Sequence, residues 1–332
     1  MGQSVFAVLV GLSIGALIMI ISGNNPVAAY YALFNGAFGS LSGWLQTLTF
    51  ATPLMLTAIT FAVGMKAGIF NIGAEGQVYV GAVGAAWVGG WIALPAGLHV
   101  AAATAFGMLF GVLWALPAAL LKIWRGVHEV ISTIMFNWIA FYFAMFLVGH
   151  LAGERAELTK PAMASARYAV LGESLTSVIF VVIALCVLVY ILLWRTRTGY
   201  ELRLAGSNPD AARYAGISVR RAILVSFIVG GLAAGLAGAA QVLGGHPSWA
   251  LFKGMGNVAN YGFMGIGIAL IGRNHPIGGI FAAIFYGGLL NGRIAMQAEA
   301  GVYSELVYVI LGIIIISLAI PDLLAIVKKR FK

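Results

Sequence analysis

Long apolar runs recur from one end of this chain to the other. The first extends from about Val5 to Ile21 and the last from about Ser304 to Val327. A helix needs about 20 apolar residues to cross a bilayer core, where every backbone polar group must be satisfied within the protein. Only 9% of the residues are charged, whereas a soluble domain has about 25%. The sequence therefore predicts an all-α, polytopic membrane protein and excludes a water-soluble globule.

About ten hydrophobic elements can be delimited, and two of them are unusually short. Short or glycine-interrupted elements predict broken or re-entrant helices. Residues 27–43 are rich in glycine and aromatic side chains, and we interpret them as an interfacial segment. The ten elements are approximately residues 5–21, 44–65, 78–94, 98–121, 130–151, 174–194, 222–243, 261–272 (short), 278–290 (short) and 304–327.

The basic residues predict the orientation of these elements. With both termini in the cytoplasm, 14 of the 19 Lys and Arg residues fall on the cytoplasmic side. Cytoplasmic loops of membrane proteins carry such an excess. We therefore interpret the net charge of +9 as loop charge, not as a nucleic-acid-binding surface. The five basic residues on the other side are Arg155, Lys160, Arg167, Lys253 and Arg293.

The most basic loop, residues 195–221, contains the signals of a short helix. Ser207 or Asn208 can cap its first N–H groups, and Pro209 fits the first helical position. Asp210 falls in the first turn, where the helix dipole favours it. We expect a helix of two to three turns that ends at a glycine, and a capped helix in a loop indicates docking to another protein. The candidate docking residues are Gly206, Asn208, Pro209, Asp210, Arg213 and Gly216.

A second informative stretch, KAGIFNIGAEGQ at residues 66–77, separates two apolar runs. Ionisable groups at membrane depth usually face a cavity or a partner, and glycines permit a broken helix beside a polar path. One interpretation is a re-entrant hairpin in which the amides of Asn71 and Gln77 face the substrate path. The alternative, equally consistent with the spacing, is a short cytoplasmic turn capped by Asn71, with Glu75 solvated.

Further candidates for a polar path lie elsewhere in the chain. Asn137 and Gln241 are amides inside two predicted spans. Tyr261 and Phe263 could stack on a flat or cyclic ligand, and an interfacial aromatic belt explains them equally well. The candidate path residues are therefore Asn71, Glu75, Gln77, Asn137, Gln241, Tyr261 and Phe263.

Nothing in the sequence predicts catalysis. It has no phosphate-binding loop of the G-x-x-x-x-G-K type, and its five histidines are too scattered to predict a metal site. The single cysteine, Cys186, lies in an apolar run, so no disulfide framework is expected. We expect no cleavable signal peptide, no catalytic residue, no metal and no cofactor in this chain. If transport is driven by ATP, then ATP and Mg²⁺ must be bound by a separate ATPase chain.

These stretches together resemble the permease subunits of bacterial ABC importers in the branched-chain amino acid, ribose and nucleoside group. FNIGAEGQ and EVISTIMFNWIA favour the nucleoside-type permeases, which carry guanosine or other purine nucleosides. The sugar permeases share the general form of the basic loop. The matching stretches are KAGIFNIGAEGQ at 66–77, VHEVISTIMFNWIA at 127–140, RTRTGYELRLAGSNPDAARYAGI at 195–217, GFMGIGIALIGRNHP at 262–276 and SELV at 304–307.

The resemblance implies one permease domain over residues 1–332, with a type II-like importer core in the bacterial inner membrane. Two permease subunits, identical or homologous, would pair around the translocation path. Two cytoplasmic ATPase subunits and an extracytoplasmic substrate-binding protein would complete the system. The helix at 206–216 in the cytoplasmic loop 195–221 then resembles the coupling helix that fits a cleft on the ATPase. The implied function is nucleoside import by alternating access.

Two other functions stay open on the sequence alone. One is a permease of the same class for ribose, another simple sugar or a branched-chain amino acid, which the ligand of the neighbouring binding protein would decide. The other is an ion-coupled secondary transporter that acts alone. Such a transporter would normally need a membrane carboxylate for coupling, and only Glu75 comes close to that position.

Overall fold

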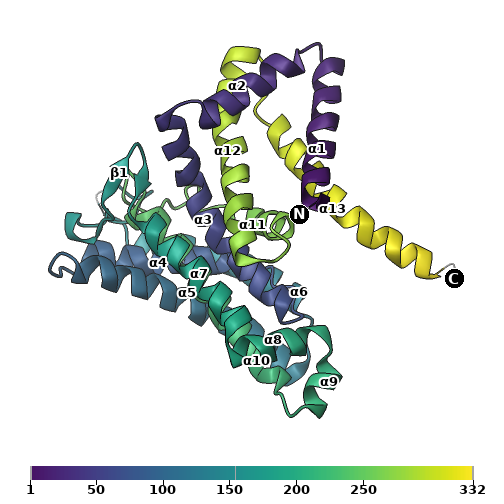
Figure 1. Ribbon diagram of the computed structural model, residues 1–332. Helices are drawn as coiled ribbons and strands as arrows, with labels where there is room; N and C mark the ends of the chain where they lie inside the picture. Colours follow the sequence, from purple (N-terminus) through teal and green to yellow (C-terminus); the bar gives the residue numbers. More distant parts are fainter. Residues whose placement is uncertain (1, 154, 331–332) are drawn as a thin grey trace.

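Helices make up nearly all of the regular structure, as a bilayer without internal water requires. The computed structural model describes residues 2–153 and 155–330, with side chains for residues 4–153 and 155–318 (Figure 1). Its helices are α1 (Gly2–Ile21), α2 (Pro26–Phe38), α3 (Leu41–Lys66), α4 (Ala74–Trp91), α5 (Leu98–Arg125), α6 (Glu129–His150), α7 (Val178–Arg195), α8 (Arg197–Ser207), α9 (Pro209–Tyr214), α10 (Val219–Leu243), α11 (Tyr261–Ile271), α12 (Pro276–Ala300) and α13 (Leu306–Arg330). A short 3₁₀ helix (Ala164–Ala166) and a hairpin of β1 (Val170–Gly172) and β2 (Leu175–Thr176) lie between α6 and α7.

The prediction of an all-α, polytopic membrane protein is confirmed. Within the described residues, seven helices are long and apolar enough to cross a membrane, namely α1, α3, α5, α6, α7, α10 and α12. α11 and the part of α13 whose side chains are described, Leu306–Leu318, are apolar but shorter.

The most closely packed region is formed by α4, α5 and α10, with α3 beside them. Small residues line these contacts, because helices in lipid associate largely through close backbone packing. A Cβ added to Gly231 of α10 would lie only 2.7 Å from the Cα of Val112 in α5. A Cβ on Gly107 of α5 would lie 2.9 Å from the Cβ of Ala239. These glycines therefore set the distances between the central helices.

A second group of helices packs around α12. α2 and α3 lie along α12, α11 packs mainly on α3, and α1 packs on α13 at the side (Figure 1). α2 covers most of the segment that was predicted to be interfacial. Its first turn is capped by Asn25, whose Oδ1 accepts from Val27 N at 3.0 Å.

The prediction of a short element at 278–290 is wrong, because α12 continues to Ala300. Polar residues after Leu290 end the apolar run but not the helix, since other helices satisfy them. Asn291 Nδ2 donates to the carbonyl of Gly43 at 3.0 Å. The guanidinium of Arg293 lies 5.1 Å from the ring centroid of Tyr308. The other predicted short element, at 261–272, is confirmed as α11.

Candidate functional site

A buried carboxylate joins the first turn of α4 to the start of α11. Glu75 is 1% exposed. Its Oε1 accepts from the hydroxyl of Tyr79 at 2.5 Å and from the backbone N–H of Asn260 at 2.5 Å. Its Oε2 accepts from Gly262 N at 2.7 Å. The first N–H groups of a helix lack partners and carry partial positive charge, so Glu75 caps α11. The prediction that Glu75 is solvated is therefore wrong, whereas the predicted cap by Asn71 is present, since its Oδ1 accepts from Gly73 N at 2.9 Å.

Asn137 of α6 bonds to the backbone on both sides of the start of α4, next to the break between α3 and α4. Its Oδ1 accepts from Gly76 N at 2.8 Å, and its Nδ2 donates to the carbonyl of Ile72 at 2.9 Å. A primary amide carries both a donor and an acceptor. This one side chain therefore satisfies one N–H and one C=O that the interruption of the helix leaves free.

The side-chain amides of Asn71 and Gln77 both lie close to Gly73. A Cβ on this glycine would lie 3.0 Å from Asn71 Oδ1 and 3.2 Å from Gln77 Nε2. Both side chains are at least 98% buried, being 1% and 2% exposed. Among the described residues, Asn71 Nδ2 and Gln77 Oε1 have no hydrogen-bond partner. An unsatisfied buried polar group costs about 1–3 kcal/mol, so the site retains one free donor and one free acceptor.

The structure brings four of the seven candidate path residues together: Asn71, Glu75, Gln77 and Asn137. Tyr261 directly precedes the capped Gly262, whereas the side chain of Phe263 is 46% exposed on the outer face of α11. Gln241 lies apart from this cluster and lines a cavity of about 120 Å³ with Thr49 and Thr52.

Sequence reasoning missed two groups that hold Glu75. Tyr79 follows it by four residues, and side chains at i and i+4 meet on one helix face, so this partner could have been found. The N–H groups of Asn260 and Gly262 are more than 180 positions away in the chain. Nothing local in the sequence connects them to Glu75.

The cluster of Asn71, Glu75, Gln77 and Asn137, here called the Glu75 cluster, is joined through Glu75 to the N-terminal end of the short helix α11. The 11 residues of α11 extend about 16 Å, whereas the hydrocarbon core of a bilayer is about 30 Å thick. Because a charge is costly inside a bilayer, we expect Arg273, in the turn after α11, to lie at a membrane surface and the opposite end of α11 to lie near the bilayer midplane. Broken helices whose ends meet at that depth are typical of transport sites.

The predicted cap in the basic loop is confirmed, and Asn208 provides it. Its Oδ1 accepts from Asp210 N at 3.1 Å and from Ala211 N at 3.0 Å. Pro209 begins α9, and Gly216 follows the helix with a φ of +75°. α9 has only 6 residues and is shorter than predicted, because α8 occupies the preceding part of the loop.

α8 packs against the break between α3 and α4, and α9 packs on α8 and α10. Gly206, at the end of α8, lies so close to this segment that an added Cβ would be 2.6 Å from Gly68 N. Ala212 anchors α9 with 0% exposure, whereas the neighbouring Tyr214 is 95% exposed. The outer face of α9 is thus free for a partner, while the adjoining α8 touches the segment that carries Asn71 through Gly206.

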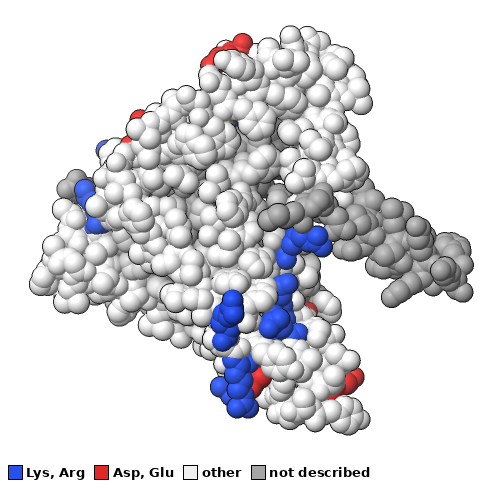
Figure 2. All heavy atoms as spheres, viewed as in Figure 1, with Lys and Arg blue, Asp and Glu red and all other residues white. Residues whose placement is uncertain are grey.

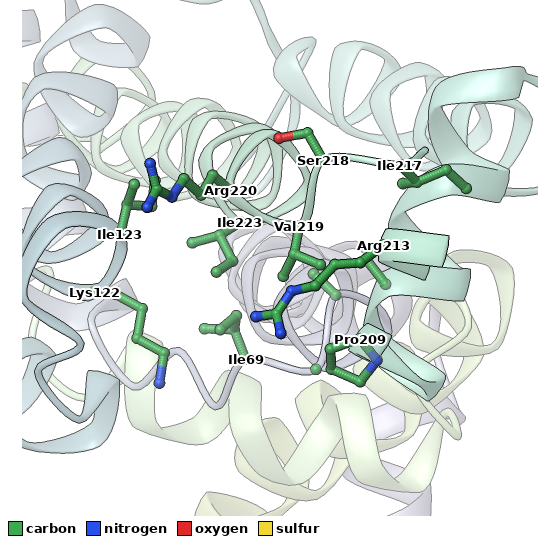
Figure 3. A pocket seen from close by; sticks show the side chains of 14 residues that line it. Ile69, Lys122, Ile123, Pro209, Arg213, Ile217, Ser218, Val219, Arg220 and Ile223 are labelled. Atoms are coloured by element: carbon green, nitrogen blue, oxygen red, sulfur yellow. The ribbon is translucent and has the colours of Figure 1, made fainter. Parts of the chain in front are cut away.

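A cavity of about 710 Å³ opens beside α9 (Figure 3). Isoleucines form much of its lining, and Figure 3 shows the guanidinium of Arg213 extending into it from the α9 side. Lys122 lines the opposite side and pairs with Glu129 at 2.7 Å. In the view of Figure 2, most of the Lys and Arg side chains gather toward this end of the molecule, around α7, α8 and α10. The cavity therefore combines apolar walls with a basic rim.

Comparison with known proteins identifies transport permeases as relatives of this chain. A family described as "Branched-chain amino acid transport system / permease component" matches residues 43–319. The guanosine ABC transporter permease protein NupP of Bacillus subtilis is 36% identical over 98% of this chain and 95% of its own length. The nucleoside ABC transporter permease protein NupB of Lactococcus lactis is 34% identical over 98% of this chain and 92% of its own length.

A relative whose name gives a different cargo is almost as similar. The glucose ABC transporter permease protein TsgB13 of Haloferax volcanii is 31% identical over 96% of this chain and 86% of its own length. No solved structure matches the chain. The family match and the near-complete coverage of these relatives lead to one conclusion. The chain belongs to the permease component family of branched-chain amino acid transport systems.

Proposed function

We propose that this chain is a permease subunit of an ATP-driven importer of nucleosides. The similarity to NupP and NupB over almost the whole chain carries this proposal. The chemistry of the Glu75 cluster supports it. Nucleosides are neutral and rich in hydrogen-bonding groups, and the free groups in the cluster are an amide donor on Asn71 and an amide acceptor on Gln77.

The contacts of α9 support a mechanism of alternating access. Binding of ATP to a separate ATPase chain would move the exposed face of α9. The close contact between Gly206 and Gly68 would carry that movement into the segment that leads to Asn71 and Glu75. Because Glu75 also holds the start of α11, the movement would reach two broken helices at once.

The loops 152–173 and 244–260, which we place on the side of the membrane opposite to α9, form one candidate surface for a substrate-binding protein. Backbone bonds join them: Thr159 N donates to Leu251 O at 3.0 Å, and Ala162 N donates to Trp249 O at 2.7 Å. A platform that is held by main-chain bonds suits repeated docking of a partner. We propose that residues 152–173 and 244–260 face the outside, and that both chain termini are cytoplasmic.

The state of Glu75 disfavours an ion-coupled transporter that acts alone. Both of its oxygens already accept hydrogen bonds from the protein, so an ion or proton would have to displace the cap of α11. Glucose is the second candidate cargo because TsgB13 is 31% identical to this chain. A sugar would also be neutral and rich in hydrogen-bonding groups.

The test is uptake of radiolabelled guanosine, ribose and glucose by cells that express this chain with its ATPase and binding protein. We expect guanosine uptake that requires an active ATPase and that is lost in Asp210→Lys, with the variant still inserted in the membrane. ATPase-dependent uptake of sugar alone would replace the nucleoside proposal with a sugar importer. Uptake without any ATPase would overturn the proposal of an ABC importer.

A further inference from the structure

Three cations lie near Trp194: Lys66 at the end of α3, Arg203 within α8, and Arg273 in the turn after α11. Lys66 Nζ lies 5.8 Å from the ring centroid of Trp194, and the guanidinium carbon of Arg203 lies 5.7 Å from the same centroid. Arg273 lies in the turn after α11, two residues before His275, whose ring centroid is 4.6 Å from that of Trp194. An aromatic face attracts cations, but it does not remove their mutual repulsion.

These three cations have no counter-ion among the described side chains. The salt bridges in that part of the chain use the cations of Lys122, Arg197 and Arg213 instead. Like charges held close together destabilise one another. An external anion bound between Lys66, Arg203 and Arg273 would relieve this repulsion.

His275 adds a neutral hydrogen-bonding group beside the same tryptophan. Its ring centroid lies 4.6 Å from that of Trp194 and 5.4 Å from that of Tyr190. Burial and the charge of Lys66 lower the pKa of His275, so the ring is neutral at pH 7. Its Nδ1 accepts from Gly278 N at 3.3 Å. The neutral ring therefore carries its proton on Nε2, where it can donate to an anion.

An apolar groove of about 730 Å³ begins at this basic cluster and runs between α1 and α12. Arg273 and His275 line one part of it, and aliphatic and aromatic side chains line the rest. Several of these side chains are exposed, including Leu9 at 57% and Phe281 at 70%. Both α1 and α12 are long and apolar enough to cross a membrane, so the groove walls fit the acyl chain of a lipid and do not fit a polar protein segment or a free phosphate ion.

Basic pockets between membrane helices bind the headgroups of anionic lipids. We propose that Lys66, Arg203 and Arg273 bind the phosphate of an anionic phospholipid whose acyl chain lies in the groove between α1 and α12. His275 donates a hydrogen bond to the same headgroup. The lipid neutralises the basic cluster and fills the space between α1 and α12. This inference does not depend on which cargo the permease carries.

The test is thermal unfolding of the purified protein in detergent during titration with phosphatidylglycerol or with phosphatidylcholine of the same chains. A ligand that binds only the folded state raises the Tm as its concentration increases. We expect phosphatidylglycerol to raise the Tm and phosphatidylcholine to have little effect. In the variant with Lys66→Gln, Arg203→Gln and Arg273→Gln together, the response to phosphatidylglycerol should fall to that of phosphatidylcholine.

A matched variant controls for surface charge in general. Arg125→Gln, Arg220→Gln and Arg221→Gln together remove the same charge from exposed positions outside the cluster, and this variant should keep the full lipid response. An equal loss in this control would overturn the proposal. A Tm shift of the same size with water-soluble glycerophosphate would also overturn it, since the groove would then contribute nothing.

A second measurement on the unmodified protein covers the case in which the triple variant does not fold. Native mass spectrometry of the protein in an equimolar mixture of the two lipids should show a bound phosphatidylglycerol that survives delipidation with detergent. Equal retention of both lipids would contradict the proposal.

Discussion

Glu75 is the residue on which most of the unusual geometry depends, since it accepts three hydrogen bonds from two helices. In Glu75→Gln one oxygen becomes an NH₂ group that faces N–H donors, and the charge that favours the helix N-termini is lost. Hydrogen bonds to charged groups contribute about 1.5–3 kcal/mol each. We expect the free energy of unfolding to fall by about 2 kcal/mol, measured as a lower Tm in detergent. Tyr79→Phe, which removes one donor, should cost less. A Glu75→Gln variant with unchanged Tm but no transport would show that the carboxylate acts on cargo instead.

The two unsatisfied amides allow stability to be separated from function. Gln77→Leu replaces a buried acceptor without a partner by an apolar group of similar size, so the stability should stay the same or rise by about 1 kcal/mol. If Gln77 contacts cargo, uptake should nevertheless fall severalfold. Asn137→Leu is the contrasting variant because both ends of that amide are bonded, and it should lower the Tm. Full uptake in Gln77→Leu would remove this residue from the path.

The lowered pKa of His275, beside the basic cluster, predicts how the stability of the protein depends on pH. Burial and the charge of Lys66 lower its pKa in the folded state, while the unfolded chain keeps the ordinary value of about 6.5. The unfolded state therefore binds the proton more readily. The contribution to stability is complete above about pH 6.5 and decreases as the pH falls through the lowered pKa of the folded state. The Tm of the unmodified protein should fall more between pH 7 and 5 than the Tm of His275→Gln. Identical pH profiles would show that the ring does not titrate in this range.

At the scale of elements, the parts that were predicted well depend on local signals. The cap of α9 follows from the order of Asn208, Pro209 and Asp210, and the structure has it. The length of α12 was not predictable, because Asn291 and Arg293 are satisfied by residues of other helices. Asn291 bonds to Gly43 in α3, and Arg293 lies over the ring of Tyr308 in α13. The same limit applies to Glu75, whose capping of α11 joins distant parts of the chain. Sequence patterns therefore predicted which polar residues interrupt the apolar runs, but not which groups those residues bond to.

The contact between α8 and the α3–α4 break gives a prediction at this scale. In Gly206→Ala the new Cβ would lie 2.6 Å from Gly68 N and 2.7 Å from the carbonyl carbon of Ala67, so the two segments must separate. Overpacking of this kind costs about 1–3 kcal/mol. We expect cargo-stimulated ATP hydrolysis and uptake to fall together in proteoliposomes. Ser207→Ala, at the exposed neighbouring position, should leave both unchanged. Normal coupling in Gly206→Ala would mean that α9 acts through another contact.

At the scale of the whole molecule, the distribution of charge predicts which side faces the cytoplasm. The positive-inside rule places α8 and α9 inside and the loops 152–173 and 244–260 outside. The only cysteine, Cys186, is buried with 0% exposure, so a single exposed cysteine can be labelled with little background. In intact spheroplasts, a membrane-impermeant maleimide should label Ala164→Cys, whereas Ser207→Cys should be labelled only after permeabilisation. Both positions are exposed, so a difference in labelling reports the side of the membrane and not burial. Labelling of Ser207→Cys alone from outside would invert the topology and place α9 beyond the reach of a cytoplasmic ATPase.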